Sequence, residues 1–248
     1  MDFTYERMIP GQYPVLIENE HLARYRFAAQ FVKDKQVADI ACGTGYGTQL
    51  LARAGAQTVR GVDLSGEAVN FSREHYHAPN VTFEVASAEK LTPLKDRQFD
   101  LVVSFETIEH LPNVEAYLDE MARILRPGGT FLVSTPDRRI ASVMHCFRGR
   151  PANCHHVREY TERELLDLLS TRFQIQACYG QGFVSGWLVF WPVQVFIKSF
   201  CRMIGTAKAR DFKENLYAGG GNIEVTLPHP GRGKIPKFWV VSCVPKVK

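Results

Sequence analysis

Residues 105–113, with the sequence FETIEHLPN, hold three side chains that could do chemistry together. Glu106, Glu109 and His110 are spaced i, i+3 and i+4, and on one helical turn this spacing brings all three to the same face. Two carboxylates and an imidazole can bind a divalent cation such as Mg²⁺, Mn²⁺ or Zn²⁺, or they can move a proton. An ordinary solvated surface is the third interpretation that the spacing allows.

The overall composition favours a single α/β domain. The chain has 248 residues, of which 45% are hydrophobic and 23% charged, and this is an ordinary globular balance. Its net charge of +4 is too small to indicate a nucleic-acid partner. The first twenty residues lack a signal-peptide pattern, and the six cysteines form no CxxC pair. We therefore expect a cytoplasmic protein with reduced thiols.

Strand patterns alternate with helix patterns along the first half of the chain. Strands are expected at 36–41, 58–64, 80–86, 99–105 and 130–136, and helices at 21–32, 49–55, 65–76 and 114–125. Ser65 is the expected N-cap of the helix at 65–76. This alternation predicts right-handed crossovers and a mostly parallel sheet with helices on both faces.

The second half of the chain is less regular. A loop is expected at 142–160, then a helix at 161–170, where Thr161 and Glu164 form a capping box. Strands at 173–180 and 237–246 flank an apolar insertion at about 183–234. The domain then divides into an N-terminal lid and helix (1–33), a cofactor-binding core (34–136) and a substrate-side region (137–248).

A glycine-rich turn after the first strand predicts a nucleotide-like cofactor. Asp39 lies near the end of that strand, and Gly43 and Gly45 follow it, so a ligand can approach the backbone closely. Asp63 closes the next strand about twenty residues later, where a carboxylate can accept both hydroxyls of a ribose. A tight strand-to-helix turn without a ligand would need the glycines but not Asp63.

The run DIACGTGYG resembles the first motif of the class I S-adenosylmethionine (SAM)-dependent methyltransferases, and the resemblance continues in order through GVDLS, ASAEKL, FDLVVSFETIEHL and ILRPGGTFLVSTP. It implies a Rossmann-like sheet of seven strands with the last strand antiparallel, and an enzyme that uses SAM. Ala41 stands where these proteins often have their first glycine. The implied cofactor-binding residues are Asp39, Ala41, Gly43, Gly45, Asp63, Leu64, Ser87, Ala88, Glu89 and Phe105.

A second resemblance concerns the three opening side chains. ExxEH followed by HxxEYT is similar to the metal site of the small-RNA 2′-O-methyltransferases, and its first part to the ubiquinone-biosynthesis O-methyltransferases. The metal ligands that it implies are Glu106, Glu109, His110 and His156, and the first three are the expected catalytic residues. Two alternatives remain open: a histidine that acts as a base without metal, and a structural role.

A broader resemblance suggests the acceptor. YERMIPG, EHLARYRFA and HHVREYTERELLDLL are similar to bacterial methyltransferases (type 11/23-like) of surface-polysaccharide pathways, and Tyr5 and Arg7 would lie in a lid. It implies O-methylation of a sugar, a glycan or another small polyhydroxylated acceptor, free or carried on a lipid. The rival functions are methylation of the 3′ end of RNA and a non-catalytic scaffold.

The insertion is the most apolar part of the chain. Residues 183–204 include Trp187 and Trp191, and Lys198, Arg202, Lys208 and Arg210 lie in or after this stretch. A helix packed in the core, a cap over the acceptor pocket, a homodimer face and peripheral contact with the inner face of a membrane all fit this pattern. In the loop that follows, Arg232 and Lys234 could meet an anionic acceptor or solvent.

Overall fold

The computed structural model describes residues 8–9, 11, 14–142, 151–204, 208, 223–227 and 234–246, and for part of 189–204 it describes the backbone alone. Tyr5, Arg7, Arg210 and Arg232 lie outside the described residues, so the predictions made for them stay predictions. The four cysteines whose side chains are described are all unpaired.

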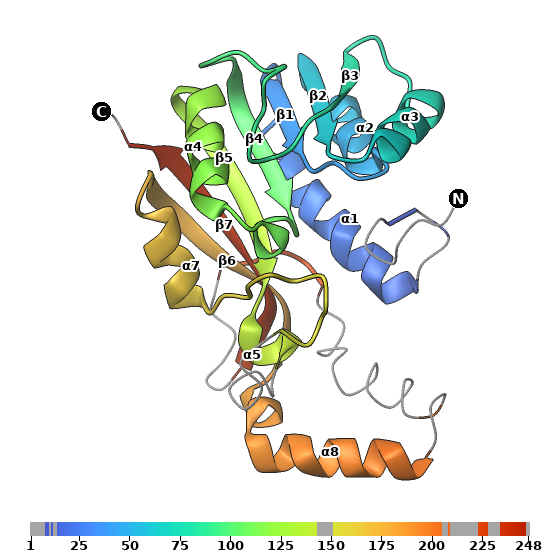
Figure 1. The fold of residues 1–248 in the computed structure, drawn as a ribbon. Coiled ribbons are helices and arrows are strands. Elements are labelled where there is room, and N and C mark those ends of the chain that lie inside the picture. Colours follow the sequence, from blue (N-terminus) through green and yellow to red (C-terminus); the bar gives the residue numbers. More distant parts are fainter. Residues whose placement is uncertain are drawn as a thin grey trace.

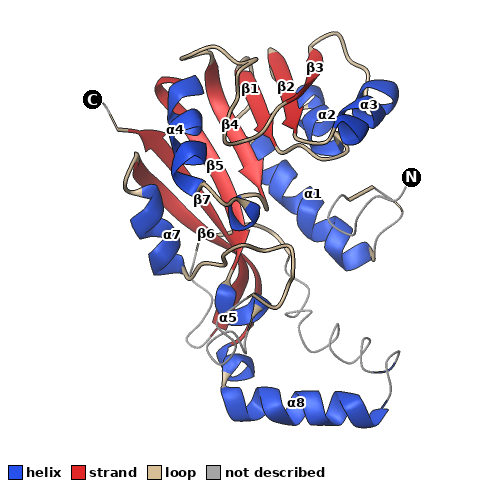
Figure 2. Ribbon diagram, viewed as in Figure 1, coloured by secondary structure: helices blue, strands red, loops and turns tan. Residues whose placement is uncertain are grey.

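A seven-stranded sheet forms the centre of the molecule (Figures 1 and 2). Its strands are β1 (Gln36–Ile40), β2 (Thr58–Asp63), β3 (Val81–Val85), β4 (Phe99–Phe105), β5 (Leu125–Pro136), β6 (Phe173–Ser185) and β7 (Lys234–Pro245). They lie in the order β3-β2-β1-β4-β5-β7-β6, and β7 runs antiparallel to both of its neighbours. The predicted fold class, with its antiparallel last strand, is confirmed.

Helices cover both faces of this sheet, as the alternating pattern predicted. They are α1 (Val15–Ala29), α2 (Tyr46–Arg53), α3 (Gly66–His75), α4 (Val114–Ile124), α5 (Arg138–Ala141), α7 (Glu162–Leu169) and α8 (Trp191–Ile204), with short 3-10 helices η1 (Ile108–His110) and η2 (Gly186–Val189). Leu101 and Val103 of β4 pack with α1 and α2, whereas Val102 packs with α4 and α7. This alternation follows from the two-residue period of a strand.

Local signals placed the starts of α3 and α7 correctly. The Ser65 side chain accepts a hydrogen bond from the Ala68 N–H, and Thr161 and Glu164 form the predicted capping box. Helix α1 begins earlier than predicted, at Val15, directly after Pro14. Proline has no N–H group, so at the start of a helix it leaves no donor of its own unsatisfied.

The insertion begins later than predicted. Residues 183–185 continue β6 and pair with the start of β7, because Phe183 lies opposite Pro236 and Ser185 opposite Lys234. These two strands therefore form a long hairpin, and η2 and α8 project from its end (Figure 1). What the sequence pattern treated as one apolar insertion is partly a sheet edge and partly a separate helical arm.

Candidate active site

The glycine-rich turn between β1 and α2 has three residues with left-handed backbone. Ala41, Gly43 and Gly45 have φ angles of 60°, 57° and 85°. A Cβ at Gly45 would lie 2.6 Å from the Ser72 hydroxyl, so only glycine fits there. A Cβ at Gly43 would meet no atom within 4 Å, so this side of the turn is open to a ligand.

Asp39 lies beneath this turn and is fully buried. Its carboxylate accepts hydrogen bonds from the Thr48 hydroxyl (2.6 Å) and from the Tyr25 hydroxyl (3.1 Å). Burial, together with the nearby charge of Asp63, raises the pKa of Asp39 to about 7 against the opposing effect of those two hydrogen bonds. The structure thus shows Asp39 binding side chains of α1 and α2, while contact with a cofactor stays a prediction.

Asp63, at the carboxyl end of β2, faces the same turn. One carboxylate oxygen accepts the Gly43 N–H and the other accepts the Ser65 N–H, both at 2.9 Å. A carboxylate oxygen has two acceptor sites, so these bonds orient the group without exhausting it. The next residue, Leu64, exposes 71% of its surface, which is unusual for leucine and suits a side chain that covers a ligand.

The other predicted cofactor residues have clear structural roles. Ser87 accepts the Glu89 N–H, and Glu89 in turn accepts the Asn113 N–H at 2.6 Å, where α4 begins. Ala88 is buried in the core, and the Phe105 ring packs edge-on against another aromatic ring of the core. Any cofactor contact of Phe105 would therefore have to come from its backbone.

Glu106 departs from the arrangement that its spacing predicted. Its φ angle is 52°, and only residues 108–110 form a helical turn, a 3-10 turn, so the expectation of one shared α-helical face is wrong. The Ser134 side chain and carbonyl on β5 bind the Glu106 N–H, and the Ser134 hydroxyl donates to the Glu106 carboxylate at 2.7 Å. Contacts between strands, which sequence spacing does not encode, turn the backbone here.

Three of the four predicted metal ligands, Glu109, His110 and His156, come together from two distant segments. One ligand atom from each lies within 4.8 Å of the others, and Glu106 is not part of this set. The two imidazole rings meet edge-on, 4.8 Å apart. Two backbone hydrogen bonds, from the Val157 and Arg158 N–H groups to the Glu109 carbonyl, hold the loop of His156 against η1.

Hydrogen bonds set the orientation of both histidines. His110 Nδ1 lies 3.1 Å from the His155 carbonyl oxygen, and His156 Nδ1 lies 2.7 Å from the Glu159 carboxylate. Because these oxygens only accept, each Nδ1 carries the proton, and Nε2 is the lone-pair nitrogen of each neutral ring. Metal-binding histidines in proteins are oriented in the same way.

The Glu109 carboxyl group is fully buried, and the Thr135 hydroxyl donates to it at 2.9 Å. Burial raises its pKa well above the usual range, and the Glu106 carboxylate raises it further. A buried carboxylate beside a second one is costly unless a cation or a proton neutralises it. The donor set therefore fits a divalent cation of mixed oxygen and nitrogen preference, and equally a proton.

Comparison with known proteins gives one consistent picture. A family model described as a methyltransferase domain matches residues 38–133. A probable SAM-dependent methyltransferase of Mycolicibacterium smegmatis is 37% identical over 185 residues, which cover 73% of this chain and 68% of that protein. The chain belongs to the SAM-dependent methyltransferases. A fatty-acid O-methyltransferase of the same organism is 36% identical over 140 residues, which cover 53% of this chain and 50% of that relative.

Solved structures support the fold of this methyltransferase. A SAM-dependent methyltransferase of Thermotoga maritima, described as a possible histamine N-methyltransferase, superposes with a TM-score of 0.61 at 20% identity, and the match covers 93% of this chain and 91% of the other. The open face at Gly43 and the oriented carboxylate of Asp63 lie where the fold binds its cofactor. The residues present thus fit SAM.

The methyltransferase also has a buried cation that sequence reasoning missed. Arg24 of α1 is fully buried, and its guanidinium donates to the Gln181 side chain at 2.6 Å and lies over the Phe238 ring. Its Nε and Nη2 atoms have no hydrogen-bond partner among the described residues. Its positive charge opposes the rise in pKa of both Tyr46, at the glycine-rich turn, and Glu109, so it acts on both parts of the candidate site.

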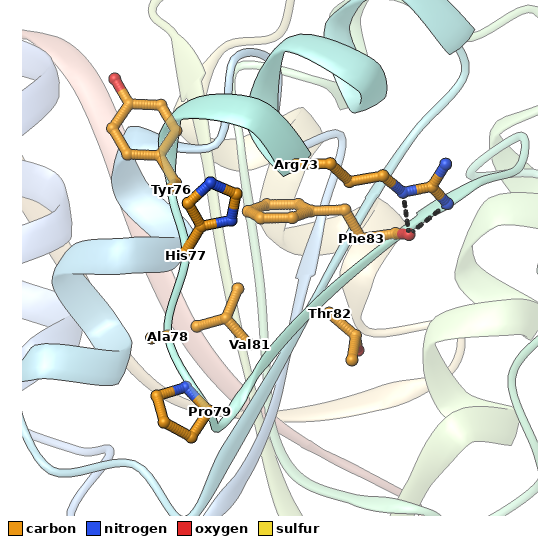
Figure 3. Close-up of a pocket in the computed structure, with 8 residues that line it drawn as sticks. All are labelled: Arg73, Tyr76, His77, Ala78, Pro79, Val81, Thr82 and Phe83. Atoms are coloured by element: carbon orange, nitrogen blue, oxygen red, sulfur yellow. Dashed lines mark hydrogen bonds between the residues drawn. The ribbon is translucent and has the colours of Figure 1, made fainter.

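A surface pocket of the methyltransferase lies elsewhere, beside the start of β3 (Figure 3). Residues between α3 and β3 line it, among them His77 and Pro79, and the Arg73 guanidinium donates two hydrogen bonds to the Phe83 carbonyl there. Those two bonds give Arg73 a structural role, because they connect α3 to β3. Because the cofactor residues follow the carboxyl ends of the strands, this pocket is not part of the candidate active site.

Proposed function

We propose that this methyltransferase transfers the methyl group of SAM to a hydroxyl oxygen of a small polyhydroxylated acceptor, such as a sugar carried on a lipid. The observation that supports it most is the Glu109–His110–His156 cluster, which follows β4 at the same edge of the sheet as the cofactor turn. Oxygen and nitrogen donors in this combination suit a site that must hold a hydroxyl group of the acceptor and remove its proton.

The transfer itself needs little from the protein beyond position and deprotonation. The acceptor oxygen attacks the methyl carbon in line with the sulfonium, the new O–C bond forms as the C–S bond breaks, and S-adenosylhomocysteine leaves. The hydroxyl proton must be lost, and here two routes compete. A divalent cation held by Glu109, His110 and His156 would lower the pKa of the bound hydroxyl so that water takes the proton.

In the route without a cation, the His110 Nε2 accepts the proton directly. The bond from Nδ1 to the His155 carbonyl supports this role, because it fixes the tautomer with the lone pair on Nε2. In this route His156 binds neither a cation nor the acceptor, and its ring only packs edge-on against His110.

The relatives inform the acceptor only as a class. One of them is named for O-methylation of a fatty acid, and this supports an oxygen nucleophile and an acceptor with a lipid part for this chain too. The polysaccharide resemblance in the sequence supports several neighbouring hydroxyls, two of which a cation could hold at once. A lipid-linked sugar combines both features.

The test is methyl transfer from labelled SAM to extracted lipid and glycan fractions, combined with metal analysis. Wild type is compared with Glu109→Gln and His156→Asn, and Glu115→Gln on the exposed face of α4 is the matched control. We expect labelled products that resist mild base, as ethers do, and a loss of bound metal and activity in both site variants.

Other outcomes separate the alternatives. If His156→Asn keeps wild-type activity and no divalent metal copurifies or stimulates the enzyme, His110 acts as the base and the cation route is wrong. If the label enters only base-labile esters, the acceptor is a carboxylate. If no fraction is labelled although SAM binds, the proposed acceptor class is wrong.

A further inference from the structure

The arm formed by η2 and α8 exposes an unusual amount of apolar surface. Trp187, Phe190, Phe196 and Met203 expose 58%, 60%, 69% and 74% of their surfaces. Among the described residues, the first three are the only tryptophan and phenylalanine side chains in the exposed class. Isolated exposed hydrophobics are common, but a gathering on one short arm marks an interaction surface.

In the part of the chain that the structure describes, a small cluster connects this arm to the rest of the molecule. Its described contacts form one small cluster, in which Leu188 and Ile197 pack on Val184 of the hairpin and on Ile140 of α5. Figure 1 shows α8 beyond the end of the β6–β7 hairpin, away from the helices that cover the sheet. One side of the arm is therefore fixed to the enzyme, and the side with Phe196 and Met203 faces outwards.

The charge of this segment indicates the kind of surface that it would meet. Residues 168–210 contain no aspartate or glutamate, and Lys198, Arg202, Lys208 and Arg210 give residues 186–210 a charge of +4. The whole chain has 30 basic and 26 acidic residues, so the rest of the chain is neutral. In the sequence, the net positive charge thus falls within α8 and the six residues that follow it.

Exposed aromatic residues within a basic segment are complementary to an anionic lipid surface. Tryptophan and phenylalanine insert at the level of the headgroups, and lysine and arginine meet the lipid phosphates. Two copies of this arm facing each other would instead bring like charges together, which disfavours a dimer through this surface. We infer that the η2–α8 arm docks the enzyme on an anionic membrane surface.

The arm lies on the surface and does not cross the membrane. Helix α8 has 14 residues, which span about 21 Å at 1.5 Å per residue, and a bilayer core is about 30 Å thick. Among the described residues no helix is long and apolar enough to span a membrane. The arm packs against Ile140 of α5, and α5 follows the end of β5, where Thr135 donates a hydrogen bond to Glu109. Docking of the arm would therefore place the Glu109–His110–His156 cluster close to the lipid.

Vesicle sedimentation tests this inference without any methyl transfer. The purified chain is mixed with vesicles of phosphatidylcholine and phosphatidylglycerol in equal parts, or with phosphatidylcholine alone. We expect binding to the anionic vesicles that weakens in high salt, and at least about tenfold weaker binding for Phe196→Ser and for the pair Lys198→Glu and Arg202→Glu.

Matched controls separate the arm from general effects. Val15→Ser changes a side chain that is 73% exposed on α1, and the pair Lys95→Glu and Arg163→Glu makes the same change in net charge away from the arm. We expect wild-type binding from both. If wild type stays in solution with anionic vesicles, or if it forms a dimer that Phe196→Ser dissociates, the inference is wrong.

Discussion

The Nδ1 atom of His156 lies 2.7 Å from Oε1 of Glu159, and both side chains are largely buried. The second oxygen of this carboxylate, Oε2, has no hydrogen-bond partner among the described residues. Within that part of the chain, the bond to His156 is what offsets the cost of burying the Glu159 carboxylate. A carboxylate behind a histidine fixes its ring and increases the basicity of Nε2. Glu159 is therefore a positioning residue for the cluster.

If the cluster holds a divalent cation as proposed, we expect Glu159→Gln to weaken metal binding by about tenfold to a hundredfold without unfolding the chain. The amide keeps the shape of the side chain, but it removes the charge that increases the basicity of His156. Calorimetry with Mn²⁺ and with Zn²⁺ measures this, and Glu115→Gln, on an exposed position of α4, is the control. Equal affinities for Glu159→Gln and wild type would show that His156 is not a ligand.

Arg24 allows a prediction in which stability and binding change in opposite directions. Arg24 is fully buried, and two of its nitrogens have no hydrogen-bond partner within the described ranges, which destabilises the folded chain, so Arg24→Met should raise the melting temperature. Its position near Tyr46 suggests that it binds an anionic group of the cofactor, and losing one charge-assisted hydrogen bond costs about 2 kcal/mol.

Two ligands report on the Arg24 prediction. S-adenosylhomocysteine carries the amino-acid carboxylate of the cofactor, whereas methylthioadenosine lacks it. Calorimetry should show that Arg24→Met binds the first about thirtyfold more weakly and the second as well as wild type does. If both ligands lose affinity equally, Arg24 supports the fold of the site and binds no carboxylate.

The buried Asp39 predicts a pH dependence of stability. Its pKa is raised from 3.8 to about 7, so between these values the folded chain holds a proton that the unfolded chain has lost. The contribution of Asp39 to stability is thus greatest at low pH and falls as the pH rises through this window, by at most about 1.4 kcal/mol per unit. Above about pH 7 it no longer changes.

Urea unfolding across this pH window measures the Asp39 effect. Asp39→Asn cannot ionise, so the difference in unfolding free energy between the variant and wild type should shift in favour of the variant as the pH rises. A difference that stays constant with pH would mean that Asp39 is ionised in the folded chain throughout.

Ala41 offers a stabilising substitution. An L-residue with a φ angle of 60° is strained by about 1 kcal/mol, and glycine removes the strain at some cost in chain entropy. We expect Ala41→Gly to increase the free energy of unfolding by up to about 1 kcal/mol. Ala54→Gly, at an exposed position with a φ angle of −76°, should decrease it instead. Thermal unfolding of both variants checks the sign.

Local sequence signals predicted the parts of the structure that depend on neighbouring residues. The capping box of Thr161 and Glu164 and the strand end at Asp63 depend on a few adjacent positions, and the sequence contains all of them. The pairing of His110 with His156 was also predicted, but only through a family resemblance, since no spacing rule relates residues in separate loops.

Long-range contacts explain what the sequence could not show. Glu106 leaves the predicted cluster because Ser134, on the neighbouring strand, holds its backbone and its carboxylate. In the sequence, Arg24 is an ordinary charged residue of a predicted helix. In the structure it is buried and donates a hydrogen bond to Gln181, which is 157 positions away. Such pairs become visible only when the sheet brings the strands together.

The Thr44 hydroxyl, in the glycine-rich turn, donates to the Met8 carbonyl at 2.6 Å, and both residues are buried. This hydrogen bond ties residue 8 to the turn whose open side, at Gly43, fits SAM. The position of this early part of the chain and the shape of the cofactor turn therefore depend on each other.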